Sequence, residues 1–281
     1  LEGFARRERE GAGTRGGVEY SRVQYALGGP LQDLGDGYAD VIGAYVRHPL
    51  ILTPKDDLSV GVAYNRKLLK DSFFSYAFRR RSNVASVTLN GSHFGDWKGR
   101  PNGLQYALSV DAGDVKQLDV GLGDPSTQGR FVKWGGSADF TQTLWPGANV
   151  RARMSAQFAS RHLDPSEQMS LGGPNAVRAY GYDAPSVDQG AIASVDLTQQ
   201  IAAVPGLSAR VFADAGRGQI NKSRALAGAD NTWNARGYGV GVSYQYKARA
   251  RVDVSHAFRV GAPAGQRPDN GQTWVTATLN F

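Results

Sequence analysis

The chain has 281 residues, no cysteine, a formal net charge of +7 and a mean hydropathy of −0.38. It contains no apolar run of the length, about 18 residues, that a transmembrane helix needs, so helical membrane proteins are excluded. The arginines are scattered rather than clustered with aromatic residues, so the positive charge does not indicate a nucleic-acid interface.

The opening segment is charged, with Arg6-Arg7-Glu8-Arg9-Glu10 in place of the apolar run of a secretory signal. We therefore expect either that a signal has been removed or that the sequence begins inside a longer protein. This segment is also the one candidate for a helix. Residues 11–16 fit a GxGxxG pattern, but no strand precedes them and no β-α-β unit surrounds them, so a dinucleotide site is not expected.

Apolar and polar residues then alternate with a period of two to the end of the chain, as they do in strands with one polar and one apolar face. In residues 238–246, for example, tyrosine and valine alternate with glycine, serine and glutamine. We count about 12 strands of about 10 residues, starting near residues 18–27, and this length suffices to cross a bilayer at a tilt. The segments are clearest at residues 58–65, 104–111, 150–158, 238–246, 251–258 and 275–281.

Two architectures give such alternation: a soluble sandwich, whose apolar face turns inward, and a membrane barrel, whose apolar face turns toward lipid. Here the polar faces carry arginine, aspartate, glutamine, serine, threonine and glycine, which suit a wet lumen. The apolar faces often end in tyrosine or tryptophan, as membrane-interface girdles do. The sequence therefore predicts an all-β fold, a transmembrane antiparallel β-barrel.

One loop stands apart, at residues 169–182, Met-Ser-Leu-Gly-Gly-Pro-Asn-Ala-Val-Arg-Ala-Tyr-Gly-Tyr. It resembles the in-folded loop of two-partner secretion transporters (the haemolysin and filamentous-haemagglutinin exporters), relatives of the BamA-type assembly barrels. That family carries a Gly-Gly pair, a spacer, and then Val-Arg-Gly-aromatic. Ala179 stands where the family usually places glycine, and because alanine tolerates a positive φ poorly, Gly181 is the alternative residue for this turn. The matching residues are Gly172, Gly173, Val177, Arg178 and Tyr180.

A second segment, residues 211–216, resembles the family's Phe-x-Asp-x-Gly strand through Phe212, Asp214 and Gly216. In the family this aspartate faces the lumen and pairs with the loop arginine. The alternation agrees independently, because Phe212 and Asp214 face inward if their neighbours face lipid. A buried guanidinium needs a carboxylate, so we expect an Arg178–Asp214 pair that fixes the loop. The alternatives are an exposed turn arginine and an aspartate that begins a loop.

The resemblance implies a 16-stranded barrel with five strands after the loop, and five candidates lie near residues 191, 207, 236, 249 and 273. It also implies that residues 1–281 are the C-terminal part of the barrel, without its first four strands or the periplasmic POTRA domains. The implied function is a monomeric pore in the bacterial outer membrane that translocates an unfolded secreted exoprotein. Phe281 resembles the terminal aromatic residue of such barrels, which targets them to the membrane through the barrel-assembly machinery.

Other chemistries find little support. The four histidines have no metal-ligand spacing, so no metal or other cofactor is expected. His162 and Asp164 suggest acid–base chemistry only weakly, and we expect them to be solvated surface. No nucleophile–base–orienter set occurs, so an enzyme is not expected. The alternatives that remain are a BamA-type assembly factor, which shares the arginine loop, and a general diffusion porin, which does not require the Arg178–Asp214 pair.

Overall fold

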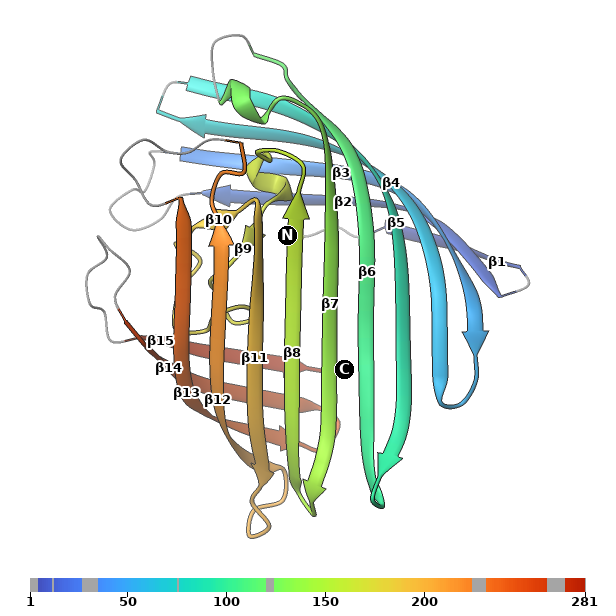
Figure 1. Cartoon of the computed structure of the whole chain (residues 1–281), viewed down its shortest axis with the longest axis vertical. Coiled ribbons are helices and arrows are strands. Elements are labelled where there is room, and N and C mark those ends of the chain that lie inside the picture. Colours follow the sequence, from blue (N-terminus) through green and yellow to red (C-terminus); the bar gives the residue numbers. More distant parts are fainter. Residues whose placement is uncertain are drawn as a thin grey trace. The chain divides into compact units, whose positions relative to one another are not determined.

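The computed structural model of the chain describes residues 5–11, 13–26, 35–74, 76–119, 124–223, 231–261 and 271–280. In these residues thirteen strands form one sheet whose order follows the chain (Figure 1). The strands of this sheet are β1 (Ala5–Gly11), β2 (Thr14–Ala26), β3 (Gly35–Leu52), β4 (Asp56–Phe73), β5 (Tyr76–Trp97), β6 (Arg100–Gln117), β7 (Gly129–Trp145), β8 (Ala148–Ala159), β11 (Gln189–Gln200), β12 (Leu207–Gln219), β13 (Thr232–Tyr246), β14 (Ala250–Arg259) and β15 (Gln272–Leu279).

The connection between β8 and β11 contains a small second sheet of β9 (Met169–Ser170) and β10 (Ser186–Val187). Two short 3-10 turns, η2 (Pro125–Thr127) and η3 (Pro165–Glu167), complete the elements. Among the residues that the structure describes, no helix is long and apolar enough to cross a membrane.

The opening charged segment is a strand and not a helix, because residues 5–11 pair antiparallel with residues 14–20 of β2. The sheet therefore has one strand more than the count made from the sequence. The all-β prediction and the five strands after the motif loop are confirmed. Strands β3 to β7 have 17 to 22 residues, well beyond the predicted 10, because pairing continues past the stretch of alternation into charged or apolar runs, such as residues 79–81 of β5 and 50–52 of β3.

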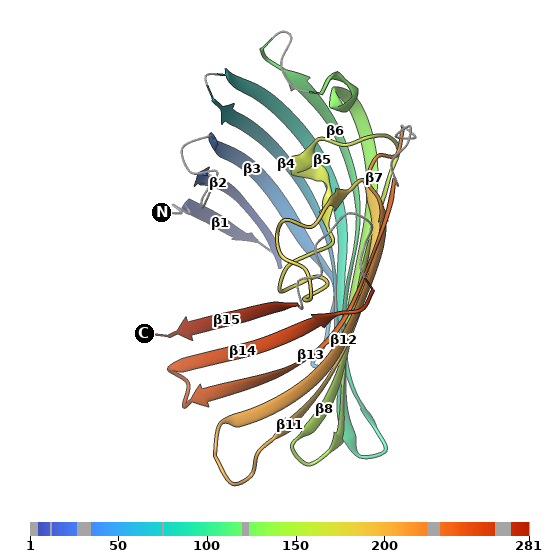
Figure 2. The same ribbon diagram turned by 90° about the vertical axis from the view of Figure 1, so that its left-hand side faces the viewer.

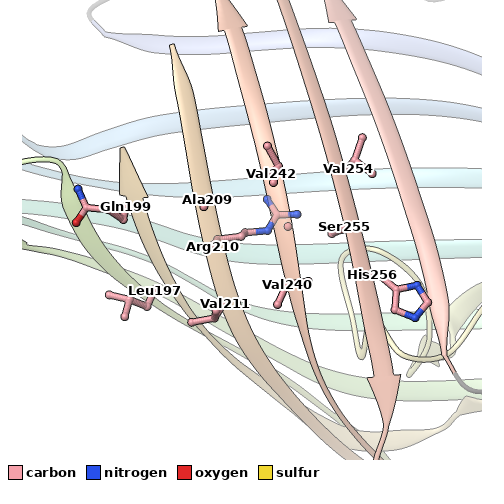
Figure 3. Close-up of a pocket in the computed structure, with 11 residues that line it drawn as sticks. Leu197, Gln199, Ala209, Arg210, Val211, Val240, Val242, Val254, Ser255 and His256 are labelled. Carbon is pink, nitrogen blue, oxygen red and sulfur yellow. The ribbon is translucent and has the colours of Figure 1, made fainter. Parts of the chain in front are cut away.

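The predicted facing of the side chains is observed in the C-terminal strands. Along β13, exposed and buried residues alternate from Thr232 to Tyr244. Val240 and its neighbours across the sheet lie on the exposed face, where they line a hollow of about 540 Å³ (Figure 3). Most of the residues that line it are apolar, as expected of a face in contact with lipid. The lining comprises Leu197, Gln199, Ala209, Arg210, Val211, Val240, Gly241, Val242, Val254, Ser255 and His256.

The chain divides into two compact units: Leu1–Gly91 with Ala107–Gly135 and Ala159–Asp164, and Ser92–Tyr106 with Gly136–Phe158 and Pro165–Phe281. In the first unit a small core joins residues of four strands, β5 to β8, to Leu163 in the segment after β8; it consists of Val84, Val115, Phe131, Ala159 and Leu163. The core of the second unit lies between the loop and the inner face of the C-terminal strands. Its members include Leu171, Val177, Ala179, Tyr180, Val187, Ile192, Phe212, Trp233, Ala235 and Ala257.

Candidate functional site

The second unit holds the motif loop against one face of its C-terminal strands, where the yellow segment lies in Figure 2. Arg178 is the centre of the contact and only 4% of its surface is exposed. Its Nε and Nη2 donate to the two carboxylate oxygens of Asp214 on β12, at 2.9 and 2.7 Å. Its Nη1 and Nη2 donate to Asp196 on β11, at 2.6 and 3.2 Å. The predicted Arg178–Asp214 contact is thus present, and a second carboxylate shares the guanidinium.

Three further contacts complete the surroundings of this guanidinium. Its carbon atom lies 3.6 Å from the ring centroid of Phe212, within the range of a cation–π contact. The backbone N–H of Arg178 also donates to Asp214, at 3.0 Å. Asp196 accepts another hydrogen bond from Arg153 on β8, at 3.2 Å. Two carboxylates therefore face two guanidinium groups, and no charge of this cluster is buried without an opposite partner.

The charge state of Arg178 follows from these contacts. Burial by itself lowers the pKa of the guanidinium, but the hydrogen bonds that it donates to Asp214 and Asp196 outweigh burial and raise the pKa above its usual value. The arginine therefore stays cationic at any pH at which the protein is folded.

The tip of the loop also contacts the last three strands. The carbonyl of Arg178 accepts a hydrogen bond from the indole N–H of Trp274 on β15, at 2.8 Å. The carbonyl of Ala179 accepts one from Nε of Arg259 on β14, at 3.0 Å. The Tyr180 ring packs edge-on against Trp233 on β13, with centroids 4.9 Å apart. With Asp196 and Asp214, the three residues 178–180 thus contact all five C-terminal strands.

The backbone of the motif loop turns at Gly173, which has φ +112°. Among the described residues, the non-glycine residues with positive φ are Phe74, Lys98 and Lys247, so Ala179 needs no left-handed conformation. Gly181 also lacks a positive φ, and the suggestion that it replaces the family's glycine in this role was wrong. A side chain at Gly172 would lie 2.2 Å from the carbonyl oxygen of Gly181, so glycine is required there for close approach.

Gly216 of β12, another predicted residue, lies where the motif loop packs against the sheet. A side chain at Gly216 would come within 2.9 Å of the Val177 methyl group, so this glycine lets the fully buried valine reach β12. At the end of the loop, the buried Asp188 accepts hydrogen bonds from Gln168 at 2.8 Å and from the backbone N–H of Lys222 at 2.7 Å. The loop is thus fixed at its tip and at its exit.

The segment between β8 and the motif loop contradicts one expectation from the sequence. His162 and Asp164 are not solvated surface, because 9% and 0% of their surfaces are exposed. In the first unit Arg80 of β5 donates to Asp164 at 2.8 Å and also pairs with Asp71 of β4. The residues that follow β8 were misjudged because polar composition alone does not distinguish a solvated loop from one whose charges are paired.

Sequence reasoning missed Asp196, Arg259 and Trp274. Asp196 had a usable signal, since it is a charged residue at an inward position of the alternating strand β11. The contacts of Arg259 and Trp274 had none, because their partners are backbone carbonyls of the loop. Phe281 lies outside the described residues.

Comparison with known proteins places this geometry in context. A family profile described as "Haemolysin secretion/activation protein ShlB/FhaC/HecB" matches residues 79–244, more than half of the chain. The Heme/hemopexin transporter protein HuxB of Haemophilus influenzae (strain 86-028NP) is 27% identical over 286 residues, which cover 97% of this chain and 50% of that protein. The chain thus spans about half the length of the curated relatives it matches.

Two solved structures share the fold. CdiB from Acinetobacter baumannii matches with a TM-score of 0.73 at 16% identity, over 96% of this chain and 48% of that one. CdiB from Escherichia coli matches with a TM-score of 0.72 at 16% identity, over 96% of this chain and 52% of that one.

Proposed function

The chain belongs to the ShlB/FhaC/HecB family of haemolysin secretion/activation proteins, and we propose that it is part of a pore that translocates a large secreted partner protein. It is a β-barrel protein of the bacterial outer membrane. In this proposal residues 1–281 supply the C-terminal part of the barrel, and the partner is an adhesin, haemolysin or similar exoprotein that crosses unfolded.

The observation that carries the proposal is the ion-paired motif loop on the inner face of β11 to β15. Arg178, with Asp214 and Phe212, is proposed to hold the loop in the position that secretion requires. Gly172, Gly173 and Gly216 allow the close approach, while Val177 and Tyr180 pack the loop against the wall. Losing either partner of a buried ion pair typically costs about 3–5 kcal/mol, because the other charge is left unpaired. The pair therefore favours one position of the loop strongly.

Three partner assignments accompany this proposal. The exposed apolar face of strands such as β13 contacts the lipid bilayer. The C-terminal strand, through Phe281, engages the barrel-assembly machinery. The third assignment is that the pore acts as a monomer.

Secretion of the cognate exoprotein by the complete protein tests the proposal. Arg178→Ala should reduce the exoprotein in the medium by at least about tenfold, since the buried Asp214 loses its cation and Asp196 keeps only its contact with Arg153, while the barrel still inserts. Arg79→Ala, which removes an exposed arginine paired with Asp119, is the matched control and should leave secretion unchanged. Normal secretion by Arg178→Ala would contradict the proposed role of the loop and favour a diffusion porin.

A further inference from the structure

The inner face of β13 has no side chain at the point where the turn after Arg178 lies against it. A Cβ atom at Gly237 would be 2.5 Å from the Cβ atom of Ala179. Two carbon atoms in contact are separated by about 3.5–4 Å, so alanine cannot occupy both positions. The loop methyl group therefore fills the space that the glycine leaves open. Ala179 is fully buried.

The loop cannot move away from β13 to relieve such a clash without losing other contacts. The carbonyl of Ala179 accepts a hydrogen bond from Arg259 at 3.0 Å, and that of Arg178 accepts one from Trp274 at 2.8 Å. Both donors come from the wall, on β14 and β15. A displacement of about 1 Å, the difference between a clash and van der Waals contact, would stretch both bonds and the contacts of Arg178 with its carboxylates.

We propose that Ala179 and Gly237 form a matched steric pair that positions the motif loop, with Gly237 as the positioning residue on the wall. Ion pairing alone fixes the loop only at the guanidinium, whereas the methyl group in the space above Gly237 fixes how closely the turn approaches β13. The consequence for secretion rests on the proposed function, but the position of the loop can be measured separately.

Residues 1–281 contain no cysteine, so a thiol introduced into the loop is the only one in this part of the protein. Val177→Cys places it at a fully buried position that becomes accessible to a maleimide only when the loop leaves the wall. Maleimide labelling is measured on the complete protein carrying Val177→Cys, in outer-membrane vesicles. Secretion of the exoprotein is measured in the same variants without Val177→Cys. Heat-modifiable migration on gels checks that each barrel has folded.

Gly237→Ala should raise the labelling rate and lower secretion, each by about tenfold, as overpacking of a tight contact would do. Adding Ala179→Gly to it should restore both. Ala179→Val should act like Gly237→Ala from the other side of the contact. In Gly237→Ala the new methyl group would also lie 3.0 Å from the Phe258 carbonyl oxygen. Ala179→Val does not create that second contact, so it tests the contact between residues 179 and 237 alone. The control is Gly61→Ala, whose methyl group would meet backbone oxygens at 3.7 and 3.9 Å and should change nothing.

Labelling at the parental rate in both Gly237→Ala and Ala179→Val would overturn the steric pair, even if Arg178→Ala still abolished secretion. Failure of the double variant to label more slowly than Gly237→Ala alone would overturn it as well. Labelling that changes as expected while secretion stays normal in every variant would support the steric pair and contradict the proposed function instead.

Discussion

Asp196 and Asp214 lie on neighbouring strands and share one guanidinium, that of Arg178, on the inner face of the sheet. The register explains the arrangement: Asp196 is opposite Phe212, two residues before Asp214, so both carboxylates and the ring lie on one face. The arginine therefore bridges β11 and β12 as well as anchoring the loop.

This sharing predicts a graded response to neutralising the carboxylates. Asp196→Asn and Asp214→Asn should each reduce secretion only partly, because Arg178 keeps one carboxylate. The double variant should be as defective as Arg178→Ala, since the cation is then buried without a partner, a state that costs about 3–5 kcal/mol. Quantifying secreted exoprotein for all four variants tests this. If Asp214→Asn alone matches Arg178→Ala, Asp196 contributes nothing.

The segment before the motif loop predicts that two adjacent arginines differ in how much they stabilise the fold. Arg80→Gln removes the cation paired with the buried Asp164 and should lower the free energy of unfolding by about 3 kcal/mol. Arg79→Gln removes only an exposed pair with Asp119 and should have a much smaller effect. Urea titrations of the complete protein in lipid vesicles measure both. Equal losses would mean that burial of the first pair is unimportant.

The facing of the strands predicts where a charge is tolerated. Val240→Arg places a cation on the lipid face of β13 and should destabilise the inserted barrel by about 2–4 kcal/mol, the cost typical of the bilayer midplane. Thr276 lies opposite Asp253 on the inner side of β15, so Thr276→Arg should destabilise the barrel far less. Refolding into vesicles under increasing urea gives both values. Similar costs for the two substitutions would show that the faces are assigned the wrong way round.

The hydrogen bond from Trp274 to the Arg178 carbonyl predicts that the loop stabilises the last strand. Trp274→Phe keeps the ring but leaves that carbonyl without its donor, a loss of about 1–3 kcal/mol for a buried acceptor. Amide hydrogen exchange should become faster in residues 272–279, with β11 and β12 as internal controls. Unchanged protection of β15 would show that its pairing with β14 suffices.

The sequence by itself determined the fold class, the five strands after the loop and the inward facing of Phe212 and Asp214. A strand's period of two assigns each side chain to a face whatever its distant neighbours are. The same property explains what was missed. Alternation is lost in runs of charged residues and in runs of apolar residues, so it left out residues 5–11 and the ends of β3 to β7.

Only the tertiary structure decided which partners meet across the chain. The period of two predicts that Asp196 faces inward, but it does not predict that Arg178 contacts Asp196. Composition, in turn, does not show that Asp164 is buried beside Arg80. Ala179 is the sharpest example. Judged by local conformation alone, it was a departure from the family's glycine, but its methyl group is accommodated by Gly237. Such a fit depends on how two segments 58 residues apart pack together, because close packing is decided by the space between segments and not by either segment alone.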